Sequence, residues 1–351
     1  MKTIKQILSI ALLSIFAISC SKDDGTTSTE SSVAKAVYAC GGISGGPTVW
    51  KDGVATTLLH NGNASVNAVV AVGSDVYAAG YDIYKSSGKI PGLVSVAKYW
   101  KNGTPISLSD GTHDAYAYDI KVVGNDVYVV GEQINPDITT SQATIWKNGV
   151  ATTLTIADNG VYESRAYSLS VVGNDVYVLG AIYYNAAYSI TVWKNGIATP
   201  ITDKNNANTY ASSIFVSGTD VYVAGRDSAL NGGEVNVATV WKNGVKTSLT
   251  TGQNGDAGAD DIFVLGTDVY VAGYENRIAK FWKNGTPTSL TDGINYAEAQ
   301  SITVSGTDVY VAFSDYDKTI AKSVAKVWKN GTVTTYGDGI NESYINSITT
   351  N

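Results

Sequence analysis

A four-residue motif, Trp-Lys-Asn-Gly or Trp-Lys-Asp-Gly, occurs seven times in this chain. Its Trp residues are Trp50, Trp100, Trp146, Trp193, Trp241, Trp282 and Trp328. The first and last Trp are 278 residues apart (328 − 50) over six intervals, so the repeat averages about 46 residues. A repeat of this length that supplies four short strands is typical of a β-propeller blade.

Each repeat divides into four strand-like segments. In one copy these are Gln300–Ser305, Asp308–Ala312, Ala325–Trp328 and Thr332–Tyr336, which we name strands A, B, C and D. Strands A and B alternate apolar and polar residues, as half-buried strands do. The turn between C and D is Asn-Gly in six copies and Asp-Gly in one. This dipeptide favours the type I′ turn of a tight hairpin.

The two ends of the chain each carry part of one blade. Strand B begins with Asp-Val-Tyr in six copies, and a degenerate seventh copy, Ala36–Gly41, has no strand A before it. At the other end, Asn346–Thr350 matches strand A, and nothing follows it but Asn351. We therefore predict an all-β, seven-bladed propeller whose C-terminal strand completes the N-terminal blade. Such closure leaves no free edge in the ring.

The N-terminus predicts export. Within residues 1–19, Lys2 and Lys5 precede the apolar segment Ile7–Ile18, which is too short to span a membrane. The sequence Ala-Ile-Ser-Cys that ends at Cys20 resembles the lipobox of bacterial lipoproteins, in which the Cys is acylated. Cys20 is therefore the predicted lipidation site and the link to a membrane. An ordinary cleaved signal with a chance Cys is the alternative.

The next segment predicts a tether. Ser-Lys-Asp-Asp at residues 21–24 resembles the surface-export signal of lipoproteins in the Bacteroidota, although a simple polar spacer is the alternative. The Ser/Thr-rich stretch that follows has no apolar period and is typical of a flexible linker. We thus expect a signal peptide (1–19), a lipidated tether (20–33) and a propeller (34–351). The expected location is the outer membrane, facing the cell exterior.

Charge and cysteine content narrow the function. The chain has 24 basic and 31 acidic residues. Residues 1–19 hold two Lys and no acid, so the remainder carries 22 − 31, or −9. This balance argues against a nucleic-acid partner. Cys40 is alone after Cys20 and is expected to be a small buried residue rather than a reactive thiol. We expect a monomer without a cofactor.

Repeated residues are expected to build the frame. The seven Trp and the Tyr of each Asp-Val-Tyr recur at fixed positions, so packing between blades explains them better than sugar stacking. Each Trp is followed by a Lys, which predicts a ring of seven Lys on the hairpin-turn face. A solvated rim is the main interpretation of that ring. Docking to an anionic surface such as lipopolysaccharide is the alternative.

The residues that differ from copy to copy are expected on the face opposite the hairpin turns. Connections B–C and D–A vary in length and content, which is how binding sites are placed on scaffolds. Strand A should be innermost, and residues ten, eight and seven places before the Asp of Asp-Val-Tyr should surround the channel mouth. The candidate ligand-binding residues are Tyr116, Tyr118, Asp119, Arg165, Tyr167, Tyr210, Asp260, Asp261, Glu298 and Tyr344. Tyr rings with amides, acids and hydroxyls suit a hydroxyl-rich ligand, while strand capping and channel hydration are the alternative.

Enzyme chemistry has little support in the sequence. His60 and His113 are the only His and lie in separate connections, so no metal site is predicted. A module that binds a glycan or a protein is therefore expected. The alternatives are a carbohydrate-active enzyme with carboxylates at the channel mouth, or an accessory scaffold of an outer-membrane complex.

The order Val-Tyr-Val-x-Gly followed by Trp, as in Val176, Tyr177 and Trp193, loosely resembles kelch and related propeller repeats. At the end of strand B, where kelch repeats have a double Gly, this chain has one only at Gly41 and Gly42. With the N-terminal features, the body resembles repeat-propeller lipoproteins of the Bacteroidota. That resemblance implies a fold and a compartment, and no reaction.

Overall fold

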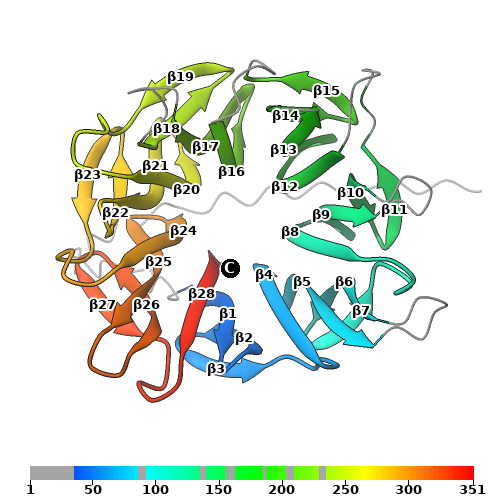
Figure 1. The fold of residues 1–351 in the computed structure, drawn as a ribbon, viewed down its shortest axis with the longest axis horizontal. Helices are drawn as coiled ribbons and strands as arrows, with labels where there is room; N and C mark the ends of the chain where they lie inside the picture. Colours follow the sequence, from blue (N-terminus) through cyan, green and yellow to red (C-terminus); the bar gives the residue numbers. More distant parts are fainter. Residues whose placement is uncertain are drawn as a thin grey trace, which may run out of the picture. The chain divides into compact units, whose positions relative to one another are not determined.

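The computed structural model describes residues 35–85, 92–134, 140–154, 156, 163–184, 187–202, 209–228 and 235–351. The predicted signal peptide, the tether and Cys20 lie outside these residues. Residues 35–351 form one compact unit of seven four-stranded antiparallel sheets. The sheets are arranged in a ring (Figure 1) around a central channel. The predicted all-β, seven-bladed propeller is confirmed. In the described part of the chain, no helix is long and apolar enough to cross a membrane.

The strands take the four predicted places in each blade. Strand A lines the channel and is β4 (Asn63–Val72), β8 (Ala115–Val123), β12 (Glu163–Val172), β16 (Thr209–Ser217), β20 (Ala257–Leu265), β24 (Ala297–Ser305) and β28 (Ser343–Thr350). Strand B is β1 (Val37–Ile43), β5 (Asp75–Lys85), β9 (Asp126–Ile134), β13 (Asp175–Tyr184), β17 (Asp220–Asp227), β21 (Asp268–Glu275) and β25 (Asp308–Asp317).

Strands C and D complete the blades toward the outside. Strand C is β2 (Gly46–Lys51), β6 (Leu93–Lys101), β10 (Ser141–Lys147), β14 (Ala187–Lys194), β18 (Val237–Lys242), β22 (Ile278–Lys283) and β26 (Lys322–Lys329). Strand D is β3 (Val54–Thr57), β7 (Thr104–Ser107), β11 (Val150–Thr153), β15 (Ile197–Pro200), β19 (Val245–Ser248), β23 (Thr286–Ser289) and β27 (Thr332–Thr335).

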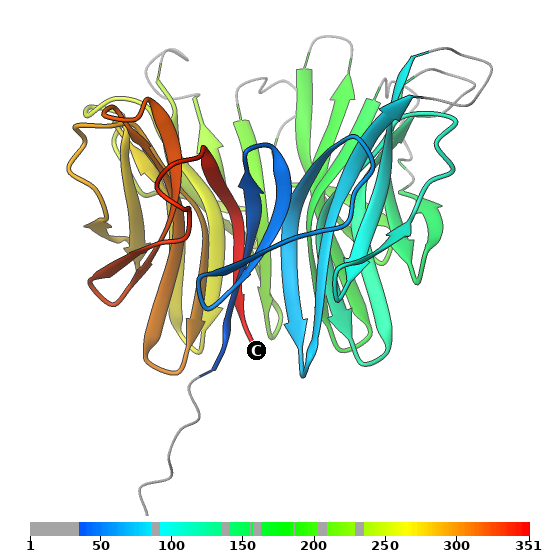
Figure 2. The same cartoon turned by 90° about the horizontal axis from the view of Figure 1, so that it is seen from below.

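The two ends of the chain close the ring, as predicted. β28 pairs antiparallel with β1, from Val37 opposite Thr350 to Ile43 opposite Ser343. The resulting blade has the order β28-β1-β2-β3. The N-terminal end of β1 and the C-terminal end of β28 both lie on the face of the tight hairpin turns (Figure 2). The sheet pairing that closes the ring therefore joins the first and last strands of the propeller.

The Trp residues lie between blades. Each of seven clusters of buried residues, counted over the described chain, combines side chains of two adjacent blades with one motif Trp. Trp146 of one blade, for example, packs with Tyr77 and Leu108 of the preceding blade and is fully buried. Trp328 differs from the other motif Trp residues, because its side chain is only partly buried. The predicted packing role of the Trp and of the Asp-Val-Tyr rings is confirmed.

The hairpin-turn face is a repeated network of polar side chains. Asn102 and Gly103 both have positive φ, 51° and 81°, as the predicted type I′ turn requires. Asn102 donates to Asp75 Oδ1 (2.9 Å) and accepts from the Val76 amide (2.9 Å). Lys101 Nζ lies 2.8 Å from Asp75 Oδ2 and 5.2 Å from the centre of the Tyr77 ring. Hydrogen bonds from Lys101 and Asn102 lower the pKa of Asp75.

This network pairs most of the Lys ring with acids. Equivalent ion pairs join Lys147, Lys194, Lys242, Lys283 and Lys329 to the Asp that begins strand B of the same blade. The blade that contains β1 differs, because Ala36 stands where the other blades have this Asp. Its acid is the turn residue Asp52, which accepts a hydrogen bond from the Val37 amide at 2.8 Å. Six of the seven Lys in the ring are therefore ion-paired with an acid of the same face, which reduces the positive charge of that face.

Candidate functional site at the mouth of the central channel

A β-bulge places one strand-A side chain of every blade in the channel. In β8, for example, Ala117 pairs with Gly131 and Asp119 with Val130, so Tyr118 is the extra residue. A bulge bends the strand and re-aims a side chain. Six of the seven bulge residues stand eight places before the Asp of strand B, and the seventh is their equivalent in the C-terminal strand. They are Asn67, Tyr118, Tyr167, Ser212, Asp260, Gln300 and Asn346. All seven line a central cavity of about 480 Å³.

The residues one place further along strand A tie adjacent blades together. Asp261 accepts hydrogen bonds from Ser213 of the preceding blade (2.7 Å) and from Ser301 Oγ (2.8 Å) and the Ile302 amide (2.9 Å) of the following blade. Asp119 accepts from Ser168 Oγ (3.0 Å) and the Leu169 amide (2.9 Å) of the following blade. We call this band of inter-blade hydrogen bonds the girdle.

Most bulge residues are also occupied with partners in the protein. Asn67 and Asn346 each donate to a backbone carbonyl of the next blade at 2.8 Å, and Gln300 accepts from the Ser314 amide at 3.1 Å. Tyr118 and Tyr167 have hydroxyl partners, as described below. In contrast, Ser212 and Asp260, from adjacent blades, make no hydrogen bond or ion pair with any described residue. Their polar groups are therefore available to a ligand.

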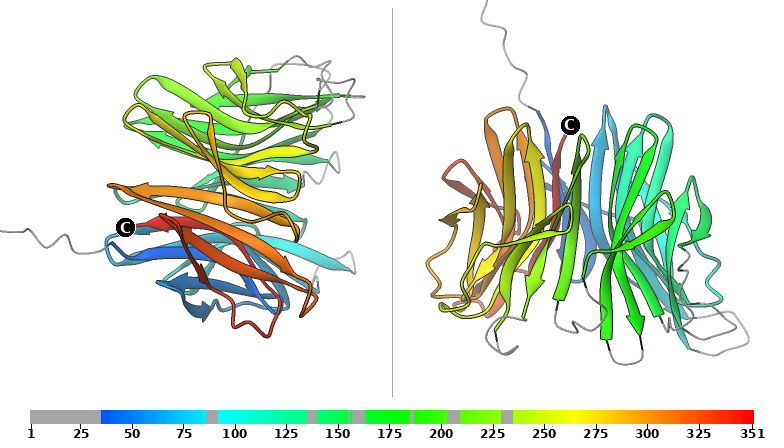
Figure 3. Two further views of the ribbon diagram at one scale, coloured as in Figure 1. Left: turned by 90° about the vertical axis from the view of Figure 1, so that its left-hand side faces the viewer. Right: turned by 90° about the horizontal axis from the view of Figure 1, so that it is seen from above.

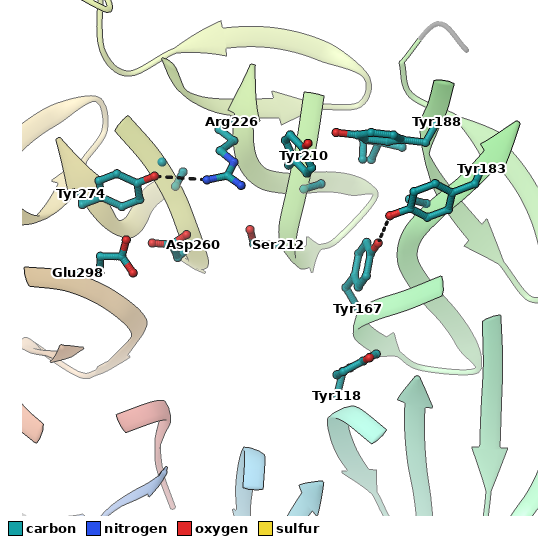
Figure 4. Close-up of a pocket in the computed structure, with 15 residues that line it drawn as sticks. Tyr118, Tyr167, Tyr183, Tyr188, Tyr210, Ser212, Arg226, Asp260, Tyr274 and Glu298 are labelled. Carbon is teal, nitrogen blue, oxygen red and sulfur yellow. Dashed lines mark hydrogen bonds between the residues drawn. The ribbon is translucent and has the colours of Figure 1, made fainter. Parts of the chain in front are cut away.

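A pocket of about 410 Å³ opens beside these two residues (Figure 4). One wall is aromatic. The hydroxyls of Tyr167 and Tyr183 are 3.2 Å apart, and ring centres are separated by 5.3 Å between Tyr183 and Tyr188 and by 5.1 Å between Tyr188 and Tyr210. The side chains come from β12, β13, β14 and β16, so the wall extends over two blades. It offers a ligand a continuous, largely apolar surface edged by hydroxyls.

The adjoining wall is charged. The Arg226 guanidinium lies over the Tyr210 ring, 4.6 Å from its centre, and Nη1 donates to the Tyr274 hydroxyl at 3.4 Å. Tyr274 in turn donates to Asp256 at 2.9 Å. Arg226 forms no ion pair within 4 Å among the described residues. It is therefore held by aromatic contacts with donors left for a ligand.

Two carboxyl groups complete this wall. Asp260 is partly buried, and desolvation, reinforced by the charge of Glu298, raises its pKa to about 8. Glu298 accepts a hydrogen bond from the Tyr296 hydroxyl. The raised pKa thus favours the protonated form of Asp260 at neutral pH. In the described part of the chain, His, Cys, Asp and Glu side chains form no group of three that could hold a metal ion.

The ten predicted residues divide into three places. The pocket contains Tyr118, Tyr167, Tyr210, Asp260 and Glu298. Asp119 and Asp261 lie deeper, in the girdle. Tyr116, Arg165 and Tyr344 lie at the mouth outside the pocket.

The contacts of the last group are specific. Tyr116 is parallel to Tyr118, with 6.3 Å between ring centres. Arg165 pairs with Glu163 at 2.6 Å and with buried Glu132 at 3.1 Å, and Glu132 also accepts from the Tyr118 hydroxyl at 2.6 Å.

Four aromatic or charged residues of the pocket were not predicted: Tyr183, Tyr188, Arg226 and Tyr274. Strands B and C supply them, whereas the prediction considered strand A alone. Arg226 and Tyr274 stand six places after the Asp of their strand B, directly opposite Tyr210 and Gly258 in the sheet. The sixth position after the strand-B Asp could therefore have been used to predict both residues from the sequence. Tyr188 has no such repeat position.

Comparison with known proteins shows the fold and no family. No family model and no curated protein matches this chain. The β-propeller domain of the Trilobed protease from Pyrococcus furiosus, described as having an open velcro topology, is 12% identical with a TM-score of 0.50, over 83% of this chain and 86% of that one. The β28–β1 pairing closes the ring in the present chain.

Two further solved structures are similar at lower scores. A chain of a nidogen/laminin complex is 12% identical with a TM-score of 0.41, over 90% of this chain and 98% of that one. Pyrococcus horikoshii acylaminoacyl peptidase is 11% identical with a TM-score of 0.46, and the match spans 78% of this chain but 46% of the peptidase.

Proposed function

We propose that this chain is a surface-displayed lipoprotein that binds a glycan in the pocket at the channel mouth. The observation that carries the proposal is the pairing of an aromatic wall with the unoccupied polar groups of Ser212, Asp260 and Arg226. The lipobox-like sequence at Cys20 and the export-like segment after it support lipid anchoring in the outer membrane and outward display.

A sugar fits the chemistry of this pocket. Sugar rings have apolar C–H faces, which stack on flat aromatic side chains, and hydroxyl groups that both donate and accept hydrogen bonds. Tyr188 and Tyr210 supply the aromatic surface, while Arg226 donates and Ser212 does both. Asp260 donates when protonated. A glycan therefore finds a partner for each of its surfaces without a new buried, unpaired charge.

Purified residues 34–351 on a broad glycan array test the proposal. We expect binding to a defined glycan group that is lost in Tyr188→Ala and in Tyr210→Ala. Tyr316→Ala is the matched control, because Tyr316 is an exposed Tyr that does not line the pocket. Binding that survives both pocket substitutions would contradict the assigned site. A blank array would contradict glycan binding and direct the search to a protein partner by pull-down from the cell surface.

The carboxyl pair favours a second candidate, a carbohydrate-active enzyme. A protonated carboxyl that donates to the glycosidic oxygen and an ionised carboxylate on the same sugar are the two groups that glycoside hydrolysis requires. The raised pKa of Asp260 suits it to the first role, and Glu298 lies in the same pocket. Release of new reducing ends from a bound glycan, abolished in Asp260→Asn and in Glu298→Gln, would support the enzyme. A glycan that stays intact after prolonged incubation with the wild-type protein would contradict the enzyme and leave glycan binding as the proposed function.

A further inference from the structure

The aromatic surface does not end at the pocket. Beyond Tyr167, ring centres follow at 6.4 Å to Tyr118, 6.3 Å from Tyr118 to Tyr116, and 4.9 Å from Tyr116 to Tyr81. These residues come from β12, β8 and β5, so the row crosses three successive blades around the mouth. We call Tyr118, Tyr116 and Tyr81 the aromatic extension.

The blade frame does not require Tyr in the extension. The position of Tyr116 is Ser65 in the preceding blade and Gly258 in another. The position of Tyr118 is Asn67 in the preceding blade, where its amide simply bonds to the backbone. Packing of the repeat thus explains the Trp and Asp-Val-Tyr rings, which are nearly invariant, but not these rings at the mouth.

The extension is also open to a ligand and held in place. Tyr81 and Tyr116 are neither buried nor fully exposed, and the Tyr118 hydroxyl is fixed on Glu132, which Arg165 holds in turn. Rings held in place by such contacts lose little freedom when a ligand binds, which favours affinity. The row is therefore a preorganised surface that is continuous with the pocket.

We propose that the ligand is an extended oligosaccharide, which places one end in the pocket and lays its following sugar units along the aromatic extension. This inference rests on the proposed glycan binding. The end in the pocket meets Asp260, Arg226 and Glu298, which can form hydrogen bonds with its hydroxyl groups. The remaining units meet rings at successive steps, so each additional unit adds contact area up to Tyr81.

Calorimetric titration with cello-, xylo-, malto- and chito-oligosaccharides of increasing length, from one sugar unit to six, tests this inference. In the series that binds, we expect affinity to rise with length. Tyr116→Ala should weaken the six-unit ligand by about tenfold and leave the shortest ligand that binds unchanged. Tyr188→Ala, in the pocket, should weaken every length.

Two controls separate the outcomes. Tyr116→Phe keeps the ring and should retain binding of the long ligand, and thermal unfolding of each variant should match the wild type. Equal affinity for short and long members, or full affinity in Tyr116→Ala, would overturn the extended ligand while leaving the pocket intact. Absence of binding in all four series, with a blank array, would overturn both proposals.

Discussion

The side-chain amide of Asn346 donates a 2.8 Å hydrogen bond to the carbonyl oxygen of Val66, which is 280 residues earlier in the chain. On the other side of the same strand, the amides of Ile345 and Ile348 donate to Ser314 and Ser301 of the preceding blade, each at 3.2 Å. β28 therefore binds β1 through the sheet and both neighbouring blades through side chains.

Removal of residues 343–351 should strongly destabilise the propeller, because it exposes the edge of β1 and breaks the girdle on both sides. We expect a large fall in the midpoint of thermal unfolding, measured by circular dichroism. A synthetic peptide of residues 339–351 should restore part of it. Unfolding of the truncated chain at the wild-type temperature would show that closure does not stabilise the ring.

Replacement of a motif Trp should cost stability in proportion to its burial. Trp146→Ala should lower the free energy of unfolding by about 3–5 kcal/mol, since a fully buried ring is lost from the contact between two blades. Trp328→Ala at the same repeat position should cost less, because Trp328 is only partly buried. Chemical denaturation measures both, and equal costs would contradict the assigned burial difference.

The buried ion pair between Lys98 and Asp82 predicts a non-additive pair of substitutions. The side chains are 5% and 0% exposed, so Lys98→Met alone leaves a buried, unpaired charge and should cost about 3–5 kcal/mol. The double variant Lys98→Met/Asp82→Leu should recover most of this loss. The exposed pair gives the control, as Lys101→Met should have a much smaller effect. Additive costs in the double-mutant cycle would refute the coupling.

The Asp residues that begin strand B should contribute to acid sensitivity. Their pKa values are lowered by hydrogen bonds from Lys, so the folded state binds fewer protons than the unfolded state in acid. The contribution is present above the unfolded pKa of about 3.9 and disappears as pH falls through the folded pKa. A variant with all six Asp replaced by Asn should lose less stability than the wild type between about pH 5 and pH 2.

That comparison is made with the free energy of unfolding at each pH. An equal loss in the wild type and the six-fold variant would assign acid sensitivity to other groups.

Asp260 should have the opposite pH dependence. Its pKa of about 8 lies above the unfolded value, so the folded state holds the extra proton and stability falls as pH rises from about 4 to about 8. The Asp260→Asn variant has no carboxyl group that titrates at this position. Its unfolding temperature, relative to that of the wild type, should therefore rise as pH increases across that window. Glu298→Gln should move the transition to lower pH, because it removes a neighbouring negative charge. Parallel temperature curves would refute the raised pKa.

The architecture was predictable because the blade repeats. The spacing of the Trp motifs set the number of blades, and the incomplete copies at Ala36 and Asn346 indicated how the ring closes. The Asn-Gly turns were predictable for the same reason, since a positive φ restricts which residues can stand there. Long-range pairing could thus be deduced from the similarity of the copies alone.

The site was predictable only in part, because it consists of departures from the repeat. Alignment selected the strand-A positions around the mouth, but it could not show that the bulge separates Asp260, which lines the pocket, from Asp261, which supports the girdle. Adjacent residues in one strand thus differ in role through one unpaired position. Tyr188 belongs to a strand whose outer part varies among blades, so only the folded chain brings it to the pocket.

The positions of β1 and β28 determine how the domain can be handled. The N-terminal end of β1 and the C-terminal end of β28 both lie on the hairpin-turn face, away from the mouth (Figure 3, right). The Ala36 amide donates a hydrogen bond to the Asn351 side chain at 3.0 Å. A sensor chip, a bead or a fluorescent reporter attached at either end of residues 35–351 would meet the same face of the ring. An immobilised domain would therefore present its open face to the analyte whichever end carries the tag.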